Sequence, residues 1–376
     1  MKLILLCLCV AAANAALAPI YMSQRRGIPN SFIIKAKDAS VLDQIETDIL
    51  AEFQTMRMPA PKVSKIRDLI PVLNLRIPPH MINIIRAIDG IEFVEQEAMA
   101  QILGQQYNPT WGIDRIDSRD GIDGVYNFND GVLGEGGHVY IVDTGMRTSH
   151  SEFNGRAQLI FGGPDDNGHG THCGGTVAGA TYGIARKAMV YSAKVCTNSG
   201  GCPTYLILDG LNAVSQRPKG VVSMSLGGGA NHALDAGVQA LIDTGYVLSI
   251  AAGNSDSDAC YNSPARVPDA LTVAASDNQD QIAYFSCWGS CVDIFAPGVN
   301  IESASHNWDT GSATMSGTSM ACPHVSGVAT LYFVKNGGAT GVVSQLLGDA
   351  SNGKIYYTKG SPNKLLYTGN VSTSDL

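Results

Sequence analysis

The second part of the chain is dominated by short, uninterrupted apolar stretches that alternate with segments of helical spacing. A strand that is apolar on both sides must be covered on both, because neither face can be left in water. Such strands separated by helices predict an α/β fold, a mainly parallel, doubly wound sheet with helices on both faces. The expected strands span residues 139–142, 189–195, 221–226, 247–251 and 271–274, and the expected helices span residues 171–180, 206–215, 233–243 and a segment that begins at Ser319.

The residues before Gly104 have a different, mixed character. Strand-like and helical segments alternate there and predict a small α+β unit with an antiparallel, ferredoxin-like sheet. No combination of residues suited to catalysis stands out in this unit. The expected strands span residues 31–36, 72–76 and 91–95, and the expected helices span residues 41–53 and 80–88.

The first fifteen residues have the layout of a secretory signal peptide. Lys2 precedes an apolar run over residues 3–13, and Ala13-Asn14-Ala15 is a small-x-small cleavage site. The run is too short to span a bilayer, and no later stretch is long enough. We therefore expect three parts, a signal peptide (1–15), the small unit (16–103) and the α/β unit (104–376), and we expect no membrane partner.

Charge and cysteine content narrow the class of protein further. The formal net charge is −8 and no basic run occurs, which argues against nucleic acid as a partner. Nine cysteines occur, of which two lie in the signal segment and an odd number, seven, remain. In an oxidising compartment at least one of the seven is then a free thiol or forms an intermolecular bond.

A glycine-rich segment, residues 317–327, places Ser319 at the start of a helix of small residues. Pro323 is expected in the first helical turn, where no backbone donor is lost. A serine there lies close to free N–H groups and to the positive end of the helix dipole, which suits negative charge developing on an attacked carbonyl oxygen. The alternative is an N-cap serine on an ordinary buried helix.

Two further motifs lie where this architecture gathers functional residues. Asp143 ends an apolar strand, and His169 lies between two glycines ahead of a helix; in parallel sheets, sites form at the carboxyl ends of strands. A serine hydroxyl needs an imidazole base, and the imidazole needs a carboxylate that orients it. The alternative for Asp143 is a strand-ending aspartate that caps a turn. The alternatives for His169 are a helix-cap loop and a metal-binding pair with His172, for which no third ligand is evident.

Five segments, in order, resemble the subtilisin-type serine endopeptidases and within them the proteinase K branch. The likeness covers essentially the whole chain after the signal, and Asp, His and Ser follow in the subtilisin order. The matching segments are Asp143-Thr144-Gly145, residues 168–173, residues 223–229, residues 251–254 and residues 317–321.

The resemblance implies a role for each matched residue. Asp143 would orient His169, which would act first as general base and then as general acid, and Ser319 would be the nucleophile. Asn254 would form the oxyanion hole together with the backbone N–H of Ser319; the alternative is a turn-forming Gly-Asn pair. No cofactor is implied for catalysis.

The resemblance also implies how a peptide would bind, as a strand added to exposed edges. One edge, which is also a wall of the primary pocket, would be Ser225, Leu226 and Gly227. The opposite wall would be Ala251, Ala252 and Gly253, whose small size leaves room for an apolar or aromatic side chain. Gly200 and Gly201 would form the second edge.

The first unit resembles the inhibitory propeptide of the family. A folded segment of this kind serves as an intramolecular chaperone and inhibitor, and the enzyme itself would remove it. The expected scissile bond joins Leu103 to Gly104, with an apolar residue before the cut.

Metal and cysteine sites are implied as well. Asp293 with the carbonyls of Pro268 and Ala270 matches a structural calcium site of the branch, the alternative being a surface aspartate in a turn. Cys260 and Cys291 match a disulfide of relatives, and Cys173 matches a free thiol. Cys196 and Cys202 depart from proteinase K and lie close enough for a local disulfide, whereas the pairing of Cys287 and Cys322 and the glycosylation of Asn370 are left open.

The sequence thus predicts a secreted, self-processing, monomeric serine endopeptidase that cleaves after apolar or aromatic residues. A lytic vacuole is the alternative location. The rival functions are a catalytically silent secreted binding protein that retains its propeptide, and a carboxylesterase.

Overall fold

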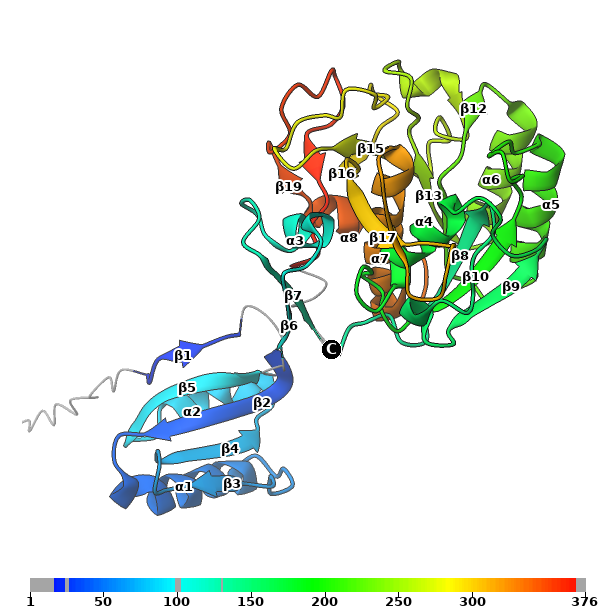
Figure 1. Cartoon of the computed structure of the whole chain (residues 1–376). Helices are drawn as coiled ribbons and strands as arrows, with labels where there is room; N and C mark the ends of the chain where they lie inside the picture. The colour runs from blue at the N-terminus through cyan, green and yellow to red at the C-terminus, as the bar shows by residue number, and fades with distance from the viewer. Residues whose placement is uncertain (1–16, 24–26, 99–102, 130, 370–376) are drawn as a thin grey trace, which may run out of the picture. The chain divides into compact units, whose positions relative to one another are not determined.

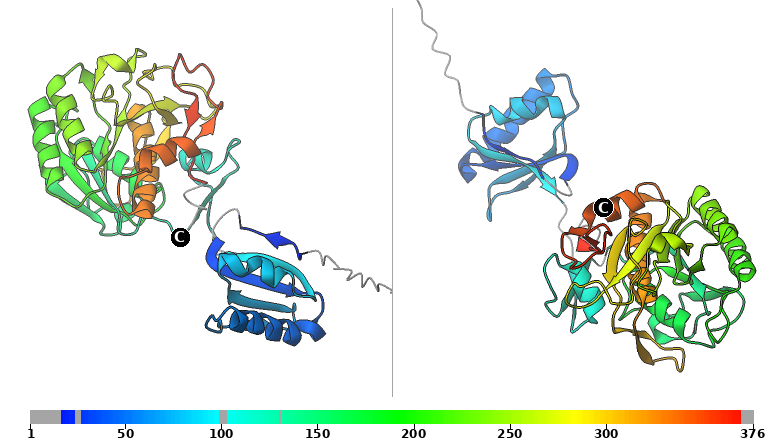
Figure 2. Two further views of the ribbon diagram at one scale, coloured as in Figure 1. Left: turned by 180° about the vertical axis from the view of Figure 1, so that it is seen from behind. Right: turned by 90° about the horizontal axis from the view of Figure 1, so that it is seen from above.

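The computed structural model describes residues 17–23, 27–98, 103–129 and 131–369. The predicted signal peptide and Asn370 lie outside these residues. The chain divides into two compact units between Ala100 and Gln101. Figure 1 draws both units, and Figure 2 gives two further views of them.

The first unit is a sheet with two helices inserted between its strands. The order β5-β2-β4-β3, with α1 after β2 and α2 after β4, is the βαββαβ arrangement of ferredoxin-like units. The four strands pair antiparallel, and β1 joins β5 in parallel. The elements are β1 (Ile20–Tyr21), β2 (Gly27–Ala36), α1 (Leu42–Thr55), β3 (Ser64–Ile66), β4 (Val72–Arg76), α2 (Ile82–Arg86) and β5 (Ile91–Ala98).

The second unit is built on a nine-stranded sheet, in the order β19-β20-β16-β15-β13-β11-β8-β10-β9. Every pair in it is parallel except β19 with β20, as the apolar strands predict. The strands are β8 (His138–Asp143), β9 (Ala157–Phe161), β10 (Met189–Lys194), β11 (Val221–Met224), β13 (Val247–Ala251), β15 (Leu271–Ser276), β16 (Ile294–Pro297), β19 (Ser351–Asn352) and β20 (Lys364–Leu365).

Helices cover both faces of this sheet, which confirms the predicted fold class. Successive residues of β8 point to opposite sides, so Val139 and Ile141 belong to one buried cluster and Tyr140 and Val142 to another. The first cluster packs against α4 (His169–Ala178), α7 (Thr318–Asn336) and α8 (Val342–Asp349). The second packs against α5 (Thr204–Ser215) and α6 (His232–Asp243), which lie side by side in Figures 1 and 2.

The start of α7 differs from the prediction. The helix begins at Thr318, so Pro323 lies in its second turn and not in the first. Proline has no N–H, and therefore the carbonyl of Ser319, four residues earlier, receives no helical hydrogen bond. That carbonyl accepts a hydrogen bond from Ser225 Oγ instead, at 2.9 Å. The missing helical hydrogen bond is thus replaced by one that connects Ser319 to the segment after β11.

Several elements that the sequence pattern did not predict are short or partly exposed. The edge strand β9 is half-exposed, and β17 (Ile301–Ala304) with β18 (Ser312–Met315) forms a separate hairpin. A second hairpin joins β6 (Leu103–Tyr107) to β7 (Val125–Asn129), and α3 (Trp111–Asp117) lies between its strands in sequence. None of the helices in the described residues has the length and apolarity needed to span a lipid bilayer.

Candidate active site

Asp143 and His169 meet at the carboxyl end of β8. Asp143 is the last residue of that strand and is 2% exposed, and His169 is the first residue of α4. Their side chains are joined by a hydrogen bond of 2.8 Å between Nδ1 of His169 and Oδ1 of Asp143. Because a carboxylate only accepts, Nδ1 carries the hydrogen and Nε2 of His169 is left as the ring's acceptor.

The charge of Asp143 determines the protonation of His169. Burial by itself would lower the pKa of the imidazole, but the adjacent carboxylate favours the imidazolium and raises the pKa well above 6.5. The neighbouring His172 behaves in the opposite way, because burial lowers its pKa to about 4. Nε2 of His172 donates to the carbonyl of Ile301 at 2.9 Å, and among the described residues His172 belongs to no group of potential metal ligands.

Asp165 organises the loop that carries His169, a role that the sequence analysis missed. Its carboxylate accepts hydrogen bonds from the backbone N–H groups of Asn167, Gly168 and Thr171 and from the hydroxyls of Thr144 and Thr171. Its position four residues before His169, in a loop rich in glycine, was the available signal. The loop enters α4 through Gly168, whose φ of +111° favours glycine.

Ser319 lies in the first turn of α7, beside the same site. Its hydroxyl donates to the carbonyl of Ser225 at 3.1 Å, and within the described ranges no hydrogen bond joins it to His169.

The thiol of Cys173 lies close to both His169 and Ser319: its sulfur is 3.9 Å from Nδ1 of His169 and 3.4 Å from the carbonyl oxygen of Ser319. Burial raises the pKa of this thiol, which therefore stays neutral at ordinary pH. Asp143, His169 and Cys173 also offer one potential metal-ligand atom each, and these atoms lie within 4.8 Å of one another.

Asn254 faces the start of α7. Its Oδ1 accepts from the backbone N–H of Thr318 at 2.8 Å and from the Thr318 hydroxyl at 2.9 Å. These two hydrogen bonds use only Oδ1, so Nδ2 of Asn254 faces away from Thr318. A Cβ atom built on Gly317 would lie 3.4 Å from Asn254 Nδ2 and 3.6 Å from the backbone nitrogen of Ser319, so both nitrogens border one small space. Thr318, which sets this orientation, was not singled out in the sequence.

The predicted substrate-binding segments line two adjoining pockets. The first has a volume of about 570 Å3 and is lined by His169, Gly200, Gly201 and residues 225–229. The second, of about 360 Å3, lies between residues 225–229 and residues 251–255 and also includes Ser319. The structure therefore brings together both predicted edges and both predicted walls.

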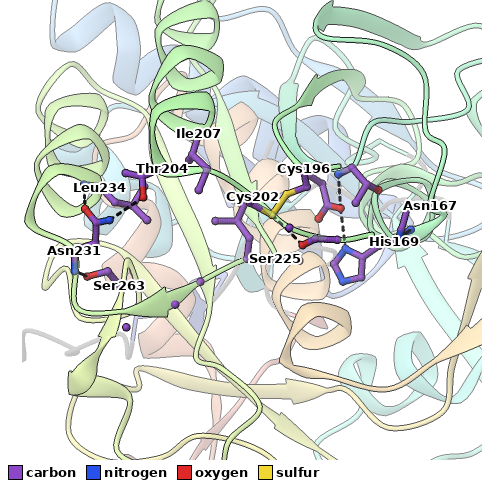
Figure 3. Close-up of a pocket in the computed structure, with 18 residues that line it drawn as sticks. Asn167, His169, Cys196, Cys202, Thr204, Ile207, Ser225, Asn231, Leu234 and Ser263 are labelled. Carbon is purple, nitrogen blue, oxygen red and sulfur yellow. Dashed lines mark hydrogen bonds and ion pairs between the residues drawn. A yellow bond between two sulfur atoms is a disulfide. The ribbon is translucent and has the colours of Figure 1, made fainter. Parts of the chain in front are cut away.

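A disulfide between Cys196 and Cys202 forms part of the first pocket. Figure 3 shows it in the pocket wall, with His169 towards one end of the pocket and Asn231, Leu234 and Ser263 at the other. A second disulfide joins Cys260 to Cys291. Cys173, Cys287 and Cys322 are free and buried, so Cys287 and Cys322 do not pair with each other.

The remaining predicted residues lie apart from this site. Asp293 Oδ2 accepts from the backbone N–H of Thr272 at 2.8 Å, two residues after Ala270, and burial raises its pKa to about 6. A partly buried carboxylate of this kind, with backbone carbonyls of Pro268 and Ala270 as expected neighbours, fits a hard cation such as Ca²⁺. The bond between Leu103 and Gly104 lies in β6, where Gly104 pairs with Phe128.

The role of Asp165 leads to a prediction about stability. Burial would raise the pKa of Asp165, but the hydrogen bonds from Thr171, Gly168 and Asn167 lower it below the usual value. A lowered pKa stabilises the fold above the unfolded-state pKa of about 4, and this contribution is lost as pH falls through the folded-state pKa. We expect Asp165→Asn to lower the free energy of unfolding by about 2 kcal/mol at pH 7 and by much less at pH 3.

Urea unfolding followed by tryptophan fluorescence measures this difference, because all three tryptophans belong to the second unit. The matched control is Asp166→Asn, which removes only the exposed partner of Lys194 and should change stability little. Equal losses for the two variants, or a loss for Asp165→Asn that persists at pH 3, would contradict the role given to Asp165.

Comparisons with known proteins agree with this geometry. Residues 134–355 match the sequence model of the Subtilase family. A cuticle-degrading serine protease of Arthrobotrys oligospora is 40% identical over 74% of this chain and 73% of its own length, and proteinase R of Parengyodontium album is 36% identical over 86% and 84%. The crystal structure of a cold-adapted subtilisin-like serine proteinase is 43% identical, covers 71% of this chain and all of its own, and has a TM-score of 0.67. The chain therefore belongs to the subtilase family and is a subtilisin-like serine protease of the proteinase K branch.

Proposed function

We propose that this protease is a secreted, self-processing endopeptidase in which Asp143, His169 and Ser319 form the catalytic triad. The observation that carries the proposal is the hydrogen bond between buried Asp143 and His169 beside the N-terminus of α7. It supplies a base of fixed tautomer beside the helix end where Ser319 and the two proposed oxyanion donors lie. Serine proteolysis in this family requires no cofactor.

The proposed reaction follows from these positions. Ser319 Oγ attacks the peptide carbonyl carbon while its proton passes to Nε2 of His169, and Asp143 stabilises the imidazolium that forms. The negative carbonyl oxygen is held by Asn254 Nδ2 and the Ser319 N–H, near the positive end of α7. His169 then protonates the leaving amine, and water hydrolyses the acyl-enzyme by the same steps.

One adjustment precedes the attack. The Ser319 hydroxyl donates to the carbonyl of Ser225, so it must turn away from that carbonyl to donate to His169. Staggered side-chain rotamers interconvert without movement of the backbone, and catalytic hydrogen bonds often tighten only when substrate is bound. We propose that a peptide strand, which would use the edge at Ser225, favours this turn.

The preference for apolar or aromatic residues before the scissile bond rests on the second pocket. One of its walls consists of Ala251, Ala252 and Gly253, which offer no side chain beyond Cβ. An aromatic ring could enter this space without displacing a side chain. Its transfer out of water into the pocket would be favourable.

We further propose that the first unit is an inhibitory propeptide, removed by cleavage between Leu103 and Gly104. The support is its ferredoxin-like fold and its separation from the second unit near residue 100. Export is proposed from the apolar leader at residues 1–15 and from two disulfides, which persist in oxidising compartments.

The central test compares the wild type with Ser319→Ala. The wild type should cleave a chromogenic peptide that has Phe before the scissile bond at least tenfold faster than one with Glu, and its mature chain should start at Gly104. Ser319→Ala should lose about 10⁶-fold in kcat and retain residues 16–103, because removing a nucleophile of this type costs about that much. Rates and N-terminal sequencing measure these outcomes; processing of Ser319→Ala at Gly104 in isolation would contradict self-cleavage.

The raised pKa of His169 predicts a pH profile. The base must be neutral to accept the serine proton, so kcat/KM should fall as pH drops through the raised pKa, with a midpoint above 6.5. In Asp143→Asn the raising charge is gone and burial dominates, so the midpoint should move to lower pH while the plateau falls by about 10⁴-fold, the loss known for the equivalent change in another triad. A midpoint that is the same in both proteins would refute the electrostatic role of Asp143.

A structural calcium ion at Asp293 is proposed from the fit of its half-buried carboxylate. EDTA should then lower the melting temperature and added Ca²⁺ should restore it, because a ligand that binds only the folded state stabilises it. In Asp293→Asn the melting temperature should respond little to either addition. Calorimetry of both proteins, kept inactive by Ser319→Ala, measures this, and an unchanged melting temperature in the parent protein would disprove the site.

A further inference from the structure

The free thiol of Cys287 lies behind the loop that carries Asn254. This loop, residues 253–257, runs beside the segment 285–288. Three backbone hydrogen bonds of 2.9 to 3.1 Å join them, donated by Cys287 to Gly253, by Asp256 to Phe285 and by Trp288 to Ser257. The two segments therefore stay paired whatever side chain occupies position 287.

The sulfur of Cys287 adds contacts that the backbone ladder does not provide. It lies 3.3 Å from Ser255 Oγ, 3.6 Å from Ser257 Oγ and 3.5 Å from Asn262 Nδ2. Asn262 also donates to the carbonyl of Ala252 at 3.2 Å and lines the second pocket. One buried atom thus links the loop that bears Asn254 with a wall of the substrate pocket.

The surroundings of this sulfur are rich in donors. Burial would raise the pKa of the thiol, but hydrogen bonds from the side chains and backbone of Ser255 and Ser257 lower it. The sulfur is therefore placed as a further acceptor on this side of the loop, in addition to the 2.8 Å hydrogen bond between the hydroxyls of Ser255 and Ser257. Cys287 itself is fully buried.

We propose that Cys287 is a positioning residue that holds the loop bearing Asn254, whose side-chain amide is oriented by Thr318, in place for oxyanion binding. This inference rests on the proposed role of Asn254. Asn254 lies between Gly253, whose carbonyl is held by the backbone of Cys287, and Ser255, whose side chain is held by its sulfur. Oxyanion donors act only when they are within a few tenths of an ångström of the productive position, so a loosened loop weakens the transition state more than substrate binding.

The test is a double-mutant cycle on kcat. The enzyme is expressed as the full chain and assayed after it has matured by its own cleavage. Cys287→Ala should lower kcat about tenfold with KM changed less than twofold, which is the signature of an interaction made only in the transition state. In an Asn254→Ala background the same substitution should change kcat less than twofold, because the group it positions is gone. Cys287→Ser, which keeps an acceptor, should lose only about threefold.

The matched control is Val292→Ala, which removes methyl groups from the same buried cluster without removing a hydrogen-bond acceptor. It should lower the melting temperature but leave kcat within twofold. Rates are divided by the amount of mature chain on a gel. The inference is overturned if Cys287→Ala resembles Val292→Ala, or if it lowers kcat by the same factor with and without Asn254.

Two outcomes separate this inference from the proposed function. If Asn254→Ala alone keeps the wild-type kcat, the proposed oxyanion role of Asn254 is wrong and the inference about Cys287 fails with it. A large loss in Asn254→Ala without any loss in Cys287→Ala would remove only the inference. If Cys287→Ala does not fold, Cys287→Ser takes its place: a threefold loss that disappears without Asn254 supports positioning, and one that persists overturns it.

Discussion

The buried contact between α7 and the segment after β11 is the constraint on which the site depends. Residues 320–332 of α7 are buried and the helix packs against α4 and five strands of the sheet, so its position is fixed by the core itself. Pro323 leaves the carbonyl of Ser319 without a helical donor, and Ser225 supplies one, while the Ser319 hydroxyl donates back to the carbonyl of Ser225. Ser319, the proposed nucleophile, is therefore connected by two hydrogen bonds to the same edge that would hold the peptide.

Much of this arrangement could be predicted from the sequence because the driving force is burial, which leaves a periodic pattern. The strands that lead to Asp143 and to the edge at Ser225 are mostly apolar and almost entirely buried, and a parallel sheet brings their carboxyl ends together. Distant residues such as His169 and Ser319 could be linked because each follows a strand or starts a helix in a recognisable glycine-rich segment. Cys196 and Cys202 were close enough in sequence for their disulfide to be expected.

The features that could not be predicted depend on single hydrogen bonds. Such bonds leave no periodic pattern in the sequence. Pro323 was expected in the first turn because helices favour proline there, but an alternative donor for one carbonyl allows it in the second. Asp165 and Thr318 hold other site residues and carry no signal beyond their position near glycines. Cys287 could not be placed at all, since its partners in residues 253–257 and Asn262 come together only through loop packing.

The disulfide in the wall of the first pocket has a consequence for recognition. Its two cysteines, six residues apart, enclose Gly200 and Gly201, residues that would otherwise be among the most pliable of the cleft. A closed ring of this size restricts the edge before any peptide arrives, so less conformational entropy is lost on association. The same restriction would limit how far the cleft can widen, so we expect extended chains to enter it more readily than bulky folded surfaces.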